Sequence, residues 1–496
     1  MKNITFLLPL FLFCTTLISA QDREVPRDTS VTTHHTVNIK GNQVNYTATA
    51  GMQPVWNSEG EVTASLFYTY YQRSGIEDKS ERPLVISFNG GPGSASVWMH
   101  IAYTGPRVLK IDDEGYPLQP YGVKENPHSI LDIADIVYVN PVNTGFSRII
   151  EAEGEEKRDR DHFFGVNADI EYLAEWINTF VTRNNRWLSP KYLIGESYGT
   201  NRVAGLALEL QNSQWMYLNG VILVSPTEMG IERDGPVEVA NRLPYFAAAA
   251  WHHKVLPPEL QEKDLEEFLP EVEQYAINEL LPALAMGGFL EAEKREALAS
   301  KMSYYSGISP EILLQHNLEV PFPYFWKELL RKDGYTIGRL DSRYLGLDRK
   351  VAGDGPDYSA ELTSWLHSFT PAINHYLRKD LNFKTDLPYF MFGPVHPWDR
   401  SRDNTGENLR QAMAQNPNLE VLIQSGYFDG GTTYFNAKYS MWQLDPSGKM
   451  KDRIFFKGYR SGHMMYLRSE DLQNANDDIR AFIQANLPKE GIPAKY

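Results

Sequence analysis

Short, nearly continuous apolar runs recur along the chain between more polar stretches. Strands that are covered on both faces of a sheet are expected to show such runs, rich in β-branched residues, rather than a strict alternation. We therefore predict buried strands at residues 83–88, 135–140, 191–195, 220–226, 420–426 and 452–458.

The N-terminal part follows a different pattern. Between residues 36 and 51, apolar and polar side chains alternate on either side of Gly41 and Asn42, which is typical of a β-hairpin with a tight turn. Residues 61–73 predict a further strand. We expect these strands to form an antiparallel edge of the sheet, and we expect the polar residues 21–35 to be flexible.

Helical periodicity appears between several of the predicted strands. Residues 202–211 and 469–487 predict two helices, and residues 167–183 predict a third. That third segment places its apolar side chains on one helical face: Ile170, Leu173, Trp176, Ile177, Phe180 and Val181. Alternation of strands with helices predicts an α/β fold, in which helices cover both faces of a mostly parallel central sheet.

Residues 245–380 differ from the rest because strand signals are nearly absent and Glu, Leu, Ala and Lys dominate. We interpret this stretch as a helical cap inserted into the α/β core, which would then comprise residues 36–244 and 381–496. The alternative is an independent helical domain. Insertion is favoured because strand signals resume only after this stretch, and the sheet needs them for its completion.

The first twenty residues carry the pattern of a secretory signal peptide. Lys2 provides the positive end, residues 6–18 form an apolar run too short to span a bilayer comfortably, and Ala20 closes it. A membrane anchor and a lipoprotein signal at Cys14 are the alternatives. This leader predicts a secreted or periplasmic protein without an integral membrane segment once the leader is removed.

Composition and charge exclude several classes of protein. Cys14 is the single cysteine among 496 residues, which excludes disulfides, cysteine catalysis and thiolate metal sites in the mature chain. The formal net charge of −15 and the absence of a basic stripe exclude nucleic acid as a partner. We expect neither a metal nor a cofactor.

The segment Gly195-Glu196-Ser197-Tyr198-Gly199 lies where a predicted strand ends and a predicted helix begins. A nucleophile elbow needs small residues two positions before and after the nucleophile, because its turn is very tight. Glycine occupies both positions here. Ser197 is therefore the candidate nucleophile, and an ordinary turn serine is the alternative.

A serine nucleophile needs a base that accepts its proton and an acid that orients the base. Asp429 and His463 each follow a predicted strand, in the order that an α/β sheet with this elbow requires. Asp452 is the fallback acid, although it starts a strand. The other histidines considered lack this combination of chain order and strand end: His34, His35, His252, His253, His316, His367 and His375.

Three glycines surround a proline in Asn89-Gly90-Gly91-Pro92-Gly93, directly after the strand predicted at residues 83–88. Backbone N–H groups in such a loop can approach a ligand without obstruction, as an oxyanion hole requires. A phosphate-binding loop is disfavoured because no Gly-Lys-Ser/Thr pattern follows and Pro92 lacks an N–H.

These pieces together resemble the serine carboxypeptidase family. Its N-G-G-P-G, G-E-S-Y, late Asp and G-H-M motifs correspond to residues 89–93, 195–199, 425–429 and 462–464. The resemblance implies an α/β-hydrolase fold with the inserted cap starting near residue 245, and it extends from about residue 60 to the C-terminus. The family's disulfides are absent, which would suit a bacterial-type member.

Carried over by position, the resemblance implies Ser197 as nucleophile, His463 as general base and acid, and Asp429 as orienting carboxylate. It implies an oxyanion hole formed by the N–H groups of Gly91 and Tyr198. Asn89 and Glu196 would then bind the terminal carboxylate of a peptide substrate, with Glu196 protonated.

Two departures from the family pattern lie at this expected carboxylate site. Ser87 stands where many members have Trp, and Tyr103 stands where many have a second Glu. Tyr103 could instead donate a phenolic hydrogen bond to the substrate. The expected function is an exported serine-type carboxypeptidase acting on peptides. An esterase or acyltransferase on the same scaffold, a peptidase with altered exo-specificity, and a peptide-binding protein with a decayed site are the alternatives.

Overall fold

The computed structural model describes residues 23–150, 160–489, 491–493 and 495–496. The predicted leader at residues 1–20 therefore lies outside the described residues. Within the described part, no helix is both long and apolar enough to cross a bilayer.

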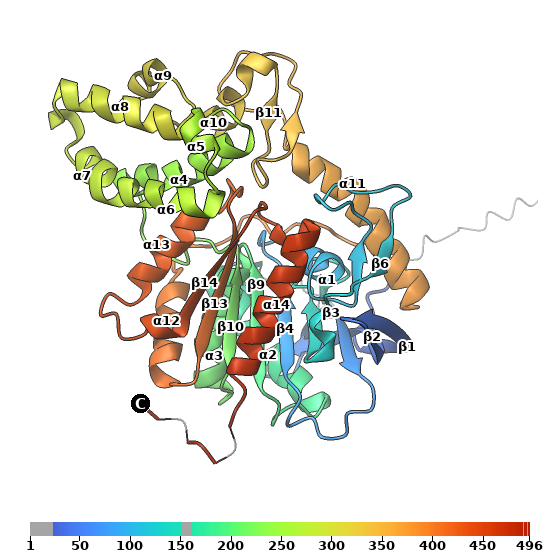
Figure 1. Cartoon of the computed structure of the whole chain (residues 1–496). Helices are drawn as coiled ribbons and strands as arrows, with labels where there is room; N and C mark the ends of the chain where they lie inside the picture. The colour runs from blue at the N-terminus through green and yellow to red at the C-terminus, as the bar shows by residue number, and fades with distance from the viewer. Residues whose placement is uncertain (1–22, 151–159, 490, 494) are drawn as a thin grey trace, which may run out of the picture.

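A mixed sheet of ten described strands forms the centre of the molecule (Figure 1). Its order is β1-β2-β3-β7-β4-β9-β10-β13-β14, with β8 beside β3. The bounds are β1 Thr29–Ile39, β2 Asn42–Trp56, β3 Val62–Arg73, β4 Leu84–Phe88, β7 Asp135–Val139, β8 Arg148–Ile149, β9 Lys191–Glu196, β10 Gly220–Val224, β13 Glu420–Gly426 and β14 Ile454–Tyr459. The strands from β7 to β14 pair in parallel, and β1, β2, β3 and β7 pair antiparallel. The predicted mostly parallel sheet with an antiparallel N-terminal edge is confirmed.

The N-terminal hairpin differs from its prediction in two respects. Strand β1 already begins at Thr29. Residues 29–35, which we expected to be flexible, therefore pair with β2 instead. They form an edge strand whose side chains are mostly solvated, which explains their polar sequence. The turn is Lys40 and Gly41 rather than Gly41 and Asn42, because both of its residues take positive φ, 48° and 82°.

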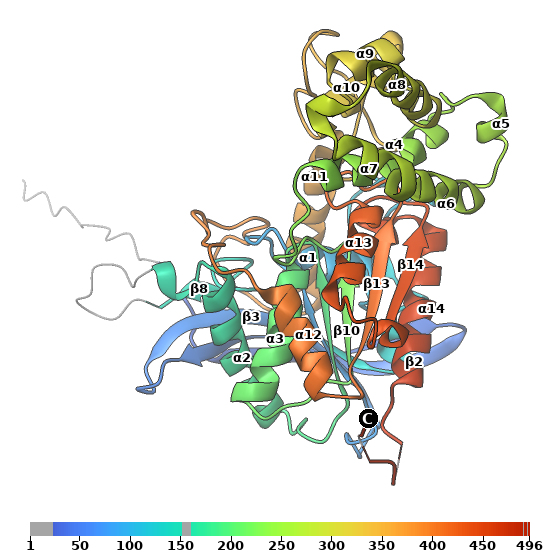
Figure 2. The same cartoon turned by 90° about the vertical axis from the view of Figure 1, so that its left-hand side faces the viewer.

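Helices cover both faces of the sheet, and each face has its own apolar core (Figure 2). Helices α2 Val166–Arg183, α3 Gly199–Ser213 and α12 Thr405–Gln415 pack on one face. Helices α1 Val97–Ala102, α11 Ala360–His375 and α14 Ser469–Ala485 pack on the other. Within β9, Leu193 belongs to the first core and its neighbour Ile194 to the second. This alternation explains why the strands read as continuous apolar runs.

A group of helices extends beyond the carboxyl ends of the parallel strands and has a separate apolar core (Figures 1 and 2). Its members are α4 Pro236–His252, α5 Pro258–Gln261, α6 Leu265–Tyr275, α7 Leu281–Leu284, α8 Ala292–Ser306, α9 Pro310–Gln315 and α10 Phe322–Glu328. The group begins at Pro236, before the expected residue 245. Helix α11 packs against the sheet-side core, where Phe369 lies 4.6 Å from the Trp98 ring centre. The helical group therefore begins before residue 245, and α11, although it precedes residue 380, belongs to the sheet side rather than to the cap.

Smaller elements connect these layers. Strands β5 Arg107–Leu109 and β6 Val123–Glu125 form one short hairpin, and β11 Thr336–Ile337 and β12 Leu345–Gly346 form another. Helix α13 Tyr434–Leu444 follows β13. The sheet order, the tight turn after β9 and the helical cap after β10 define the α/β-hydrolase fold, as the resemblance implied.

Candidate active site

Ser197 occupies a sharp turn between β9 and α3. Its φ of +57° lies in the left-handed region, which non-glycine residues seldom adopt. A Cβ at Gly195 would lie 2.1 Å from the Gly199 carbonyl oxygen, and a Cβ at Gly199 would lie 2.9 Å from that of Phe88. Only glycine fits at both positions, so the two glycines allow the turn that exposes Ser197.

Asp429 and His463 meet through a hydrogen bond of 2.7 Å between Oδ2 and Nδ1. The Asp429 carboxylate is buried, and it also accepts hydrogen bonds from the N–H groups of Gly431 and Thr432. Burial acts to lower the pKa of His463, but the Asp429 charge and hydrogen bond outweigh it and raise that pKa above its usual value. Because Nδ1 donates to Asp429, Nε2 is left to accept a proton.

Backbone contacts place the elbow beside the His463 loop. The Ser197 N–H donates to the Val224 carbonyl oxygen at 2.9 Å, and the hydroxyl of the next residue, Ser225, donates to the His463 carbonyl oxygen at 2.8 Å. No hydrogen bond joins the Ser197 hydroxyl to His463 Nε2 among the described residues, and neither atom has another partner there. Both atoms are therefore available for a substrate.

The glycine loop packs directly on the elbow. A Cβ at Gly90 would lie 2.5 Å from the Tyr198 backbone nitrogen. Gly91 is exposed and has a φ of +107°. In the described part of the chain, neither the Gly91 N–H nor the Tyr198 N–H donates a hydrogen bond. Two free N–H groups on adjoining segments next to Ser197 are what an oxyanion hole requires.

Arg202 fixes this arrangement, and sequence reasoning missed it. Its guanidinium donates to the carbonyl oxygens of Asn89 at 2.5 Å and Pro92 at 2.6 Å. It also forms a buried ion pair with Asp169 at 2.6 Å. The helix after the elbow thus holds the glycine loop through one side chain.

The predicted carboxylate-binding residues form a buried network. Asn89 Nδ2 donates to Glu196 Oε1 at 3.0 Å, and the Tyr466 hydroxyl donates to Glu196 Oε2. Burial raises the pKa of Glu196 to about 7, although both hydrogen bonds and His463 oppose the shift. Tyr466 was missed, since its only sequence signal is its position shortly after the Gly-His-Met motif.

Tyr103 contacts this network through Tyr466 and does not bond Asn89 or Glu196 among the described residues. Its ring stacks on Tyr466, with 4.6 Å between centroids and 12° between planes. Its hydroxyl donates to Gln424 Oε1 at 2.5 Å, so its proton is already engaged inside the protein. Ser87 is buried as well, and its hydroxyl has no partner among the described residues. The arrangement makes Tyr103 a support for Tyr466, while a direct contact with substrate stays a prediction.

One segment of the insertion connects the loops that carry Asp429 and His463. The Gly430 N–H donates to the Arg339 carbonyl oxygen at 2.9 Å, and the His463 N–H donates to that of Leu340 at 2.6 Å. Arg343 completes this connection, because Nη2 donates to Ser461 Oγ at 3.0 Å and to Asp341 at 2.7 Å. We call residues 339–343 the bridging segment.

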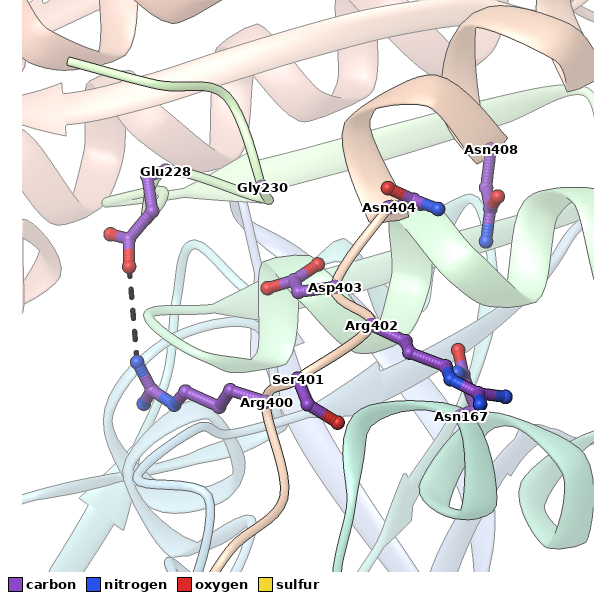
Figure 3. Close-up of a pocket in the computed structure, with 9 residues that line it drawn as sticks. All are labelled: Asn167, Glu228, Gly230, Arg400, Ser401, Arg402, Asp403, Asn404 and Asn408. Atoms are coloured by element: carbon purple, nitrogen blue, oxygen red, sulfur yellow. Dashed lines mark ion pairs between the residues drawn. The ribbon is translucent and has the colours of Figure 1, made fainter.

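A surface pocket of about 550 Å³ lies next to the elbow (Figure 3). Arg400, Arg402 and Glu228 line it, and Arg400 is 3.8 Å from Glu228. The Arg400 guanidinium also lies over the Tyr198 ring, 5.6 Å from its centre. In Figure 3 the two arginines point in different directions, so they do not converge on one ligand group.

The remaining candidates are placed away from this chemistry. Asp452 precedes β14, at the end of the strand opposite to His463. His253 bonds the Ser342 carbonyl oxygen at 2.6 Å, next to the bridging segment. Within the described residues, no group of three or more His, Cys, Asp or Glu side chains is arranged to hold a metal ion.

The model of the serine carboxypeptidase family matches residues 40–266. Over these residues, which make up less than half of the chain, the chain is similar to that family. The match includes the glycine loop and the elbow, whereas Asp429 and His463 lie beyond it.

Curated serine carboxypeptidases are similar to part of the chain, and one solved structure aligns with most of it. Serine carboxypeptidase S10 family member 1 of Dictyostelium discoideum is 26% identical over 33% of this chain and 35% of its own length. The pheromone-processing carboxypeptidase KEX1 of Ogataea parapolymorpha is 31% identical over 33% of this chain and 25% of its own. The crystal structure of the prohormone-processing carboxypeptidase Kex1(delta)p from Saccharomyces cerevisiae aligns over 88% of this chain and 91% of its own, at 14% identity and TM-score 0.49. The chain matches about a third of the length of the curated relatives.

Proposed function

We propose that this protein is an exported serine-type carboxypeptidase that hydrolyses the C-terminal peptide bond of peptides through Ser197, Asp429 and His463. The observation that carries the proposal is the 2.7 Å hydrogen bond between Asp429 and His463. The His463 loop and the elbow of Ser197 are both hydrogen-bonded to the end of β10, at Ser225 and Val224. The similarity of residues 40–266 to the serine carboxypeptidase family supports the same reaction class.

In the proposed acylation step, the Ser197 oxygen attacks the carbonyl carbon of the substrate and its proton moves to His463 Nε2. The negative charge that develops on the carbonyl oxygen is stabilised by the Gly91 and Tyr198 N–H groups. His463 then gives the proton to the leaving nitrogen as the C–N bond breaks, leaving an ester on Ser197. Hydrogen bonds that carry such transfers are often absent in unliganded enzymes and form in the substrate complex.

Deacylation repeats these roles with water as the nucleophile. Water gives a proton to His463 Nε2 as it attacks the ester, and the proton returns to the Ser197 oxygen as the acyl group leaves. An alcohol in place of water would make the protein an acyltransferase, and an ester substrate would make it an esterase. The same three side chains serve all of these reactions, so the acceptor and the leaving group separate them.

Selectivity for the C-terminal bond is proposed to arise around Asn89 and Glu196. A protonated Glu196 can donate a hydrogen bond to a carboxylate, and its pKa of about 7 makes this form substantial up to neutral pH. Export is proposed from the leader pattern at residues 1–20.

Labelling with a fluorophosphonate tests the nucleophile. We expect folded wild-type protein to gain one adduct at Ser197, and Ser197→Ala to gain none at an unchanged melting temperature. Ser58→Ala, which alters an exposed serine in the turn between β2 and β3, is the matched control and should label normally. Absence of an adduct in folded wild-type protein would favour a peptide-binding protein without catalysis.

Mass spectrometry of a mixed peptide pool tests the bond that is cut. We expect ladders shortened from the C-terminus, which Ser197→Ala does not produce. Internal cuts would indicate altered exo-specificity, and turnover of short-chain esters alone would indicate the esterase.

A further inference from the structure

Arg339 is an exposed residue of the bridging segment that the proposed reaction does not use. A Cβ built on Gly431 would lie 3.8 Å from Arg339 Nε, and the Gly431 N–H donates to Asp429 at 2.8 Å. The arginine side chain therefore runs along the loop that carries Asp429. Its guanidinium makes no hydrogen bond or ion pair with any residue that the structure describes.

The backbone on both sides of this side chain is held firmly. Its own carbonyl oxygen accepts from Gly430, and the next carbonyl oxygen, on Leu340, accepts from the His463 N–H at 2.6 Å. The Leu340 N–H donates to the buried Glu361 carboxylate at 2.8 Å. Arg339 thus projects from a fixed point between the loops of Asp429 and His463.

The charges around the imidazole differ in their access to a ligand. Asp429 and Glu196 are buried, and both raise the pKa of His463. Arg339 lowers that pKa, which places its positive charge within electrostatic reach of the ring. It is exposed, whereas the nearby Arg343 is buried and paired with Asp341. Arg339 is therefore an accessible cation within electrostatic reach of His463.

The residues assigned to the terminal carboxylate are, by contrast, bonded to one another. Asn89, Glu196 and Tyr466 are buried in one network, and the Tyr103 proton is engaged by Gln424. A substrate carboxylate gains additional stabilisation from a donor that is not already occupied. A guanidinium offers two parallel N–H groups that match a carboxylate.

We propose that Arg339 binds a carboxylate of the residue that leaves. This inference rests on the proposed function, since it needs the leaving nitrogen to lie beside His463 Nε2. The main-chain carboxylate of that residue is only two bonds from the nitrogen, so it comes close to His463, and the Arg339 charge lies within electrostatic reach of the same ring. An acidic side chain of the same residue presents the same chemical group, and the experiment separates the two sources.

The test measures binding and labelling in parallel. Calorimetry in the Ser197→Ala background, without turnover, compares three N-blocked dipeptides. The first has an uncharged last side chain and a free C-terminal carboxylate, the second is the C-terminal amide of the first (the neutral amide), and the third is a C-terminal amide with Asp as the last residue. We expect the free carboxylate to bind about tenfold more tightly than the neutral amide, a gain discounted for the exposure of the site. Arg339→Gln should reduce that preference several-fold, because Asn89 and Glu196 remain, and Arg339→Lys should restore part of the loss, because Lys keeps the charge but not the paired donors.

Arg349→Gln is the matched control, because Arg349 is exposed and lies in the same insertion. It should keep the wild-type preference. Loss of selectivity for the Asp amide alone, with the free carboxylate unaffected, would assign Arg339 to acidic side chains. If Arg339→Gln binds the free carboxylate and the Asp amide as much more tightly than the neutral amide as the parent protein does, the proposal is wrong.

Fluorophosphonate labelling of the protein with Ser197 intact distinguishes a failure of the Arg339 proposal from a failure of the proposed function. Without competitor, Arg339→Gln should still gain an adduct at Ser197, because all three residues of the proposed triad are intact. If wild type is not labelled but the Arg339-dependent preference persists, catalysis fails while carboxylate binding stands.

Discussion

The backbone N–H of His463 donates to the carbonyl oxygen of Leu340 at 2.6 Å, across 123 residues of chain. Through this bond the loop of the proposed general base is attached to the insertion rather than to the sheet alone. The same segment receives the Gly430 N–H from the loop of Asp429. The insertion therefore takes part in setting the distance between the two side chains.

Replacement of Arg343 by Lys should loosen this connection. Lys keeps a charge near Asp341 but cannot bond Asp341 and Ser461 in the same geometry. We expect a loss of stability of about 1–3 kcal/mol, and a lower His463 pKa as its contact with Asp429 weakens. The pH dependence of the labelling rate measures that pKa. Arg82→Lys, in another buried ion pair with Asp135, is the control that should lose stability without moving the profile.

Asp429→Asn should lower the labelling rate and the turnover number by roughly 10²- to 10⁴-fold. The Asn amide can donate a hydrogen bond to Nδ1, which favours the tautomer with the ring proton on Nε2 and prevents Nε2 from acting as a base. Rates at several pH values, with circular dichroism to confirm the fold, provide the measurement. An unchanged rate would remove Asp429 from the proposed triad, whereas Asp452→Asn should leave the rate within about twofold, as expected for a surface change.

Glu196→Gln should move the acid limb of the labelling profile to lower pH. Labelling needs neutral His463, so the rate rises as pH passes through the His463 pKa. The Glu196 carboxylate is one of the groups that raise this pKa, and an uncharged amide removes its contribution. A neutral fluorophosphonate is the suitable probe, because it carries no carboxylate for this network to bind. A limb that stays in place would mean that the two groups are not coupled.

The same variant should reveal a pH-dependent stability. Burial raises the folded-state pKa of Glu196 from 4.5 to about 7, so its protonated form stabilises the fold fully below pH 4.5. That contribution declines as pH rises to about 7 and then stays constant. At 1.36 kcal/mol for each pKa unit, the change amounts to roughly 3 kcal/mol. Gln does not titrate, so the melting temperature of Glu196→Gln relative to wild type should increase between pH 4.5 and 7.5. A constant difference would contradict the raised pKa.

The elbow, the glycine loop, Asp429 and His463 could all be proposed from the sequence, because each lies at or within a few residues of the end of a predicted strand. Carboxyl ends of parallel strands meet at one edge of a sheet, so residues at such ends are brought together by the fold itself. The predicted hairpin turn lies one residue too far along the chain, because the two adjacent positive φ values at Lys40 and Gly41 decide the position of the turn. Strand β1 was partly missed because a solvated edge strand has no apolar run.

Sequence alone therefore determined the fold class, the order of the proposed catalytic residues and the need for glycine around Ser197, since these follow from local pattern and steric limits. Only the tertiary structure decided that Arg202 holds the glycine loop, that Tyr466 rather than Tyr103 bonds Glu196, and that the Arg339 side chain lies near the loop of Asp429. These contacts join segments far apart in the chain. Their partners have no fixed spacing, and the free energy that selects them comes from burial and packing of the whole molecule.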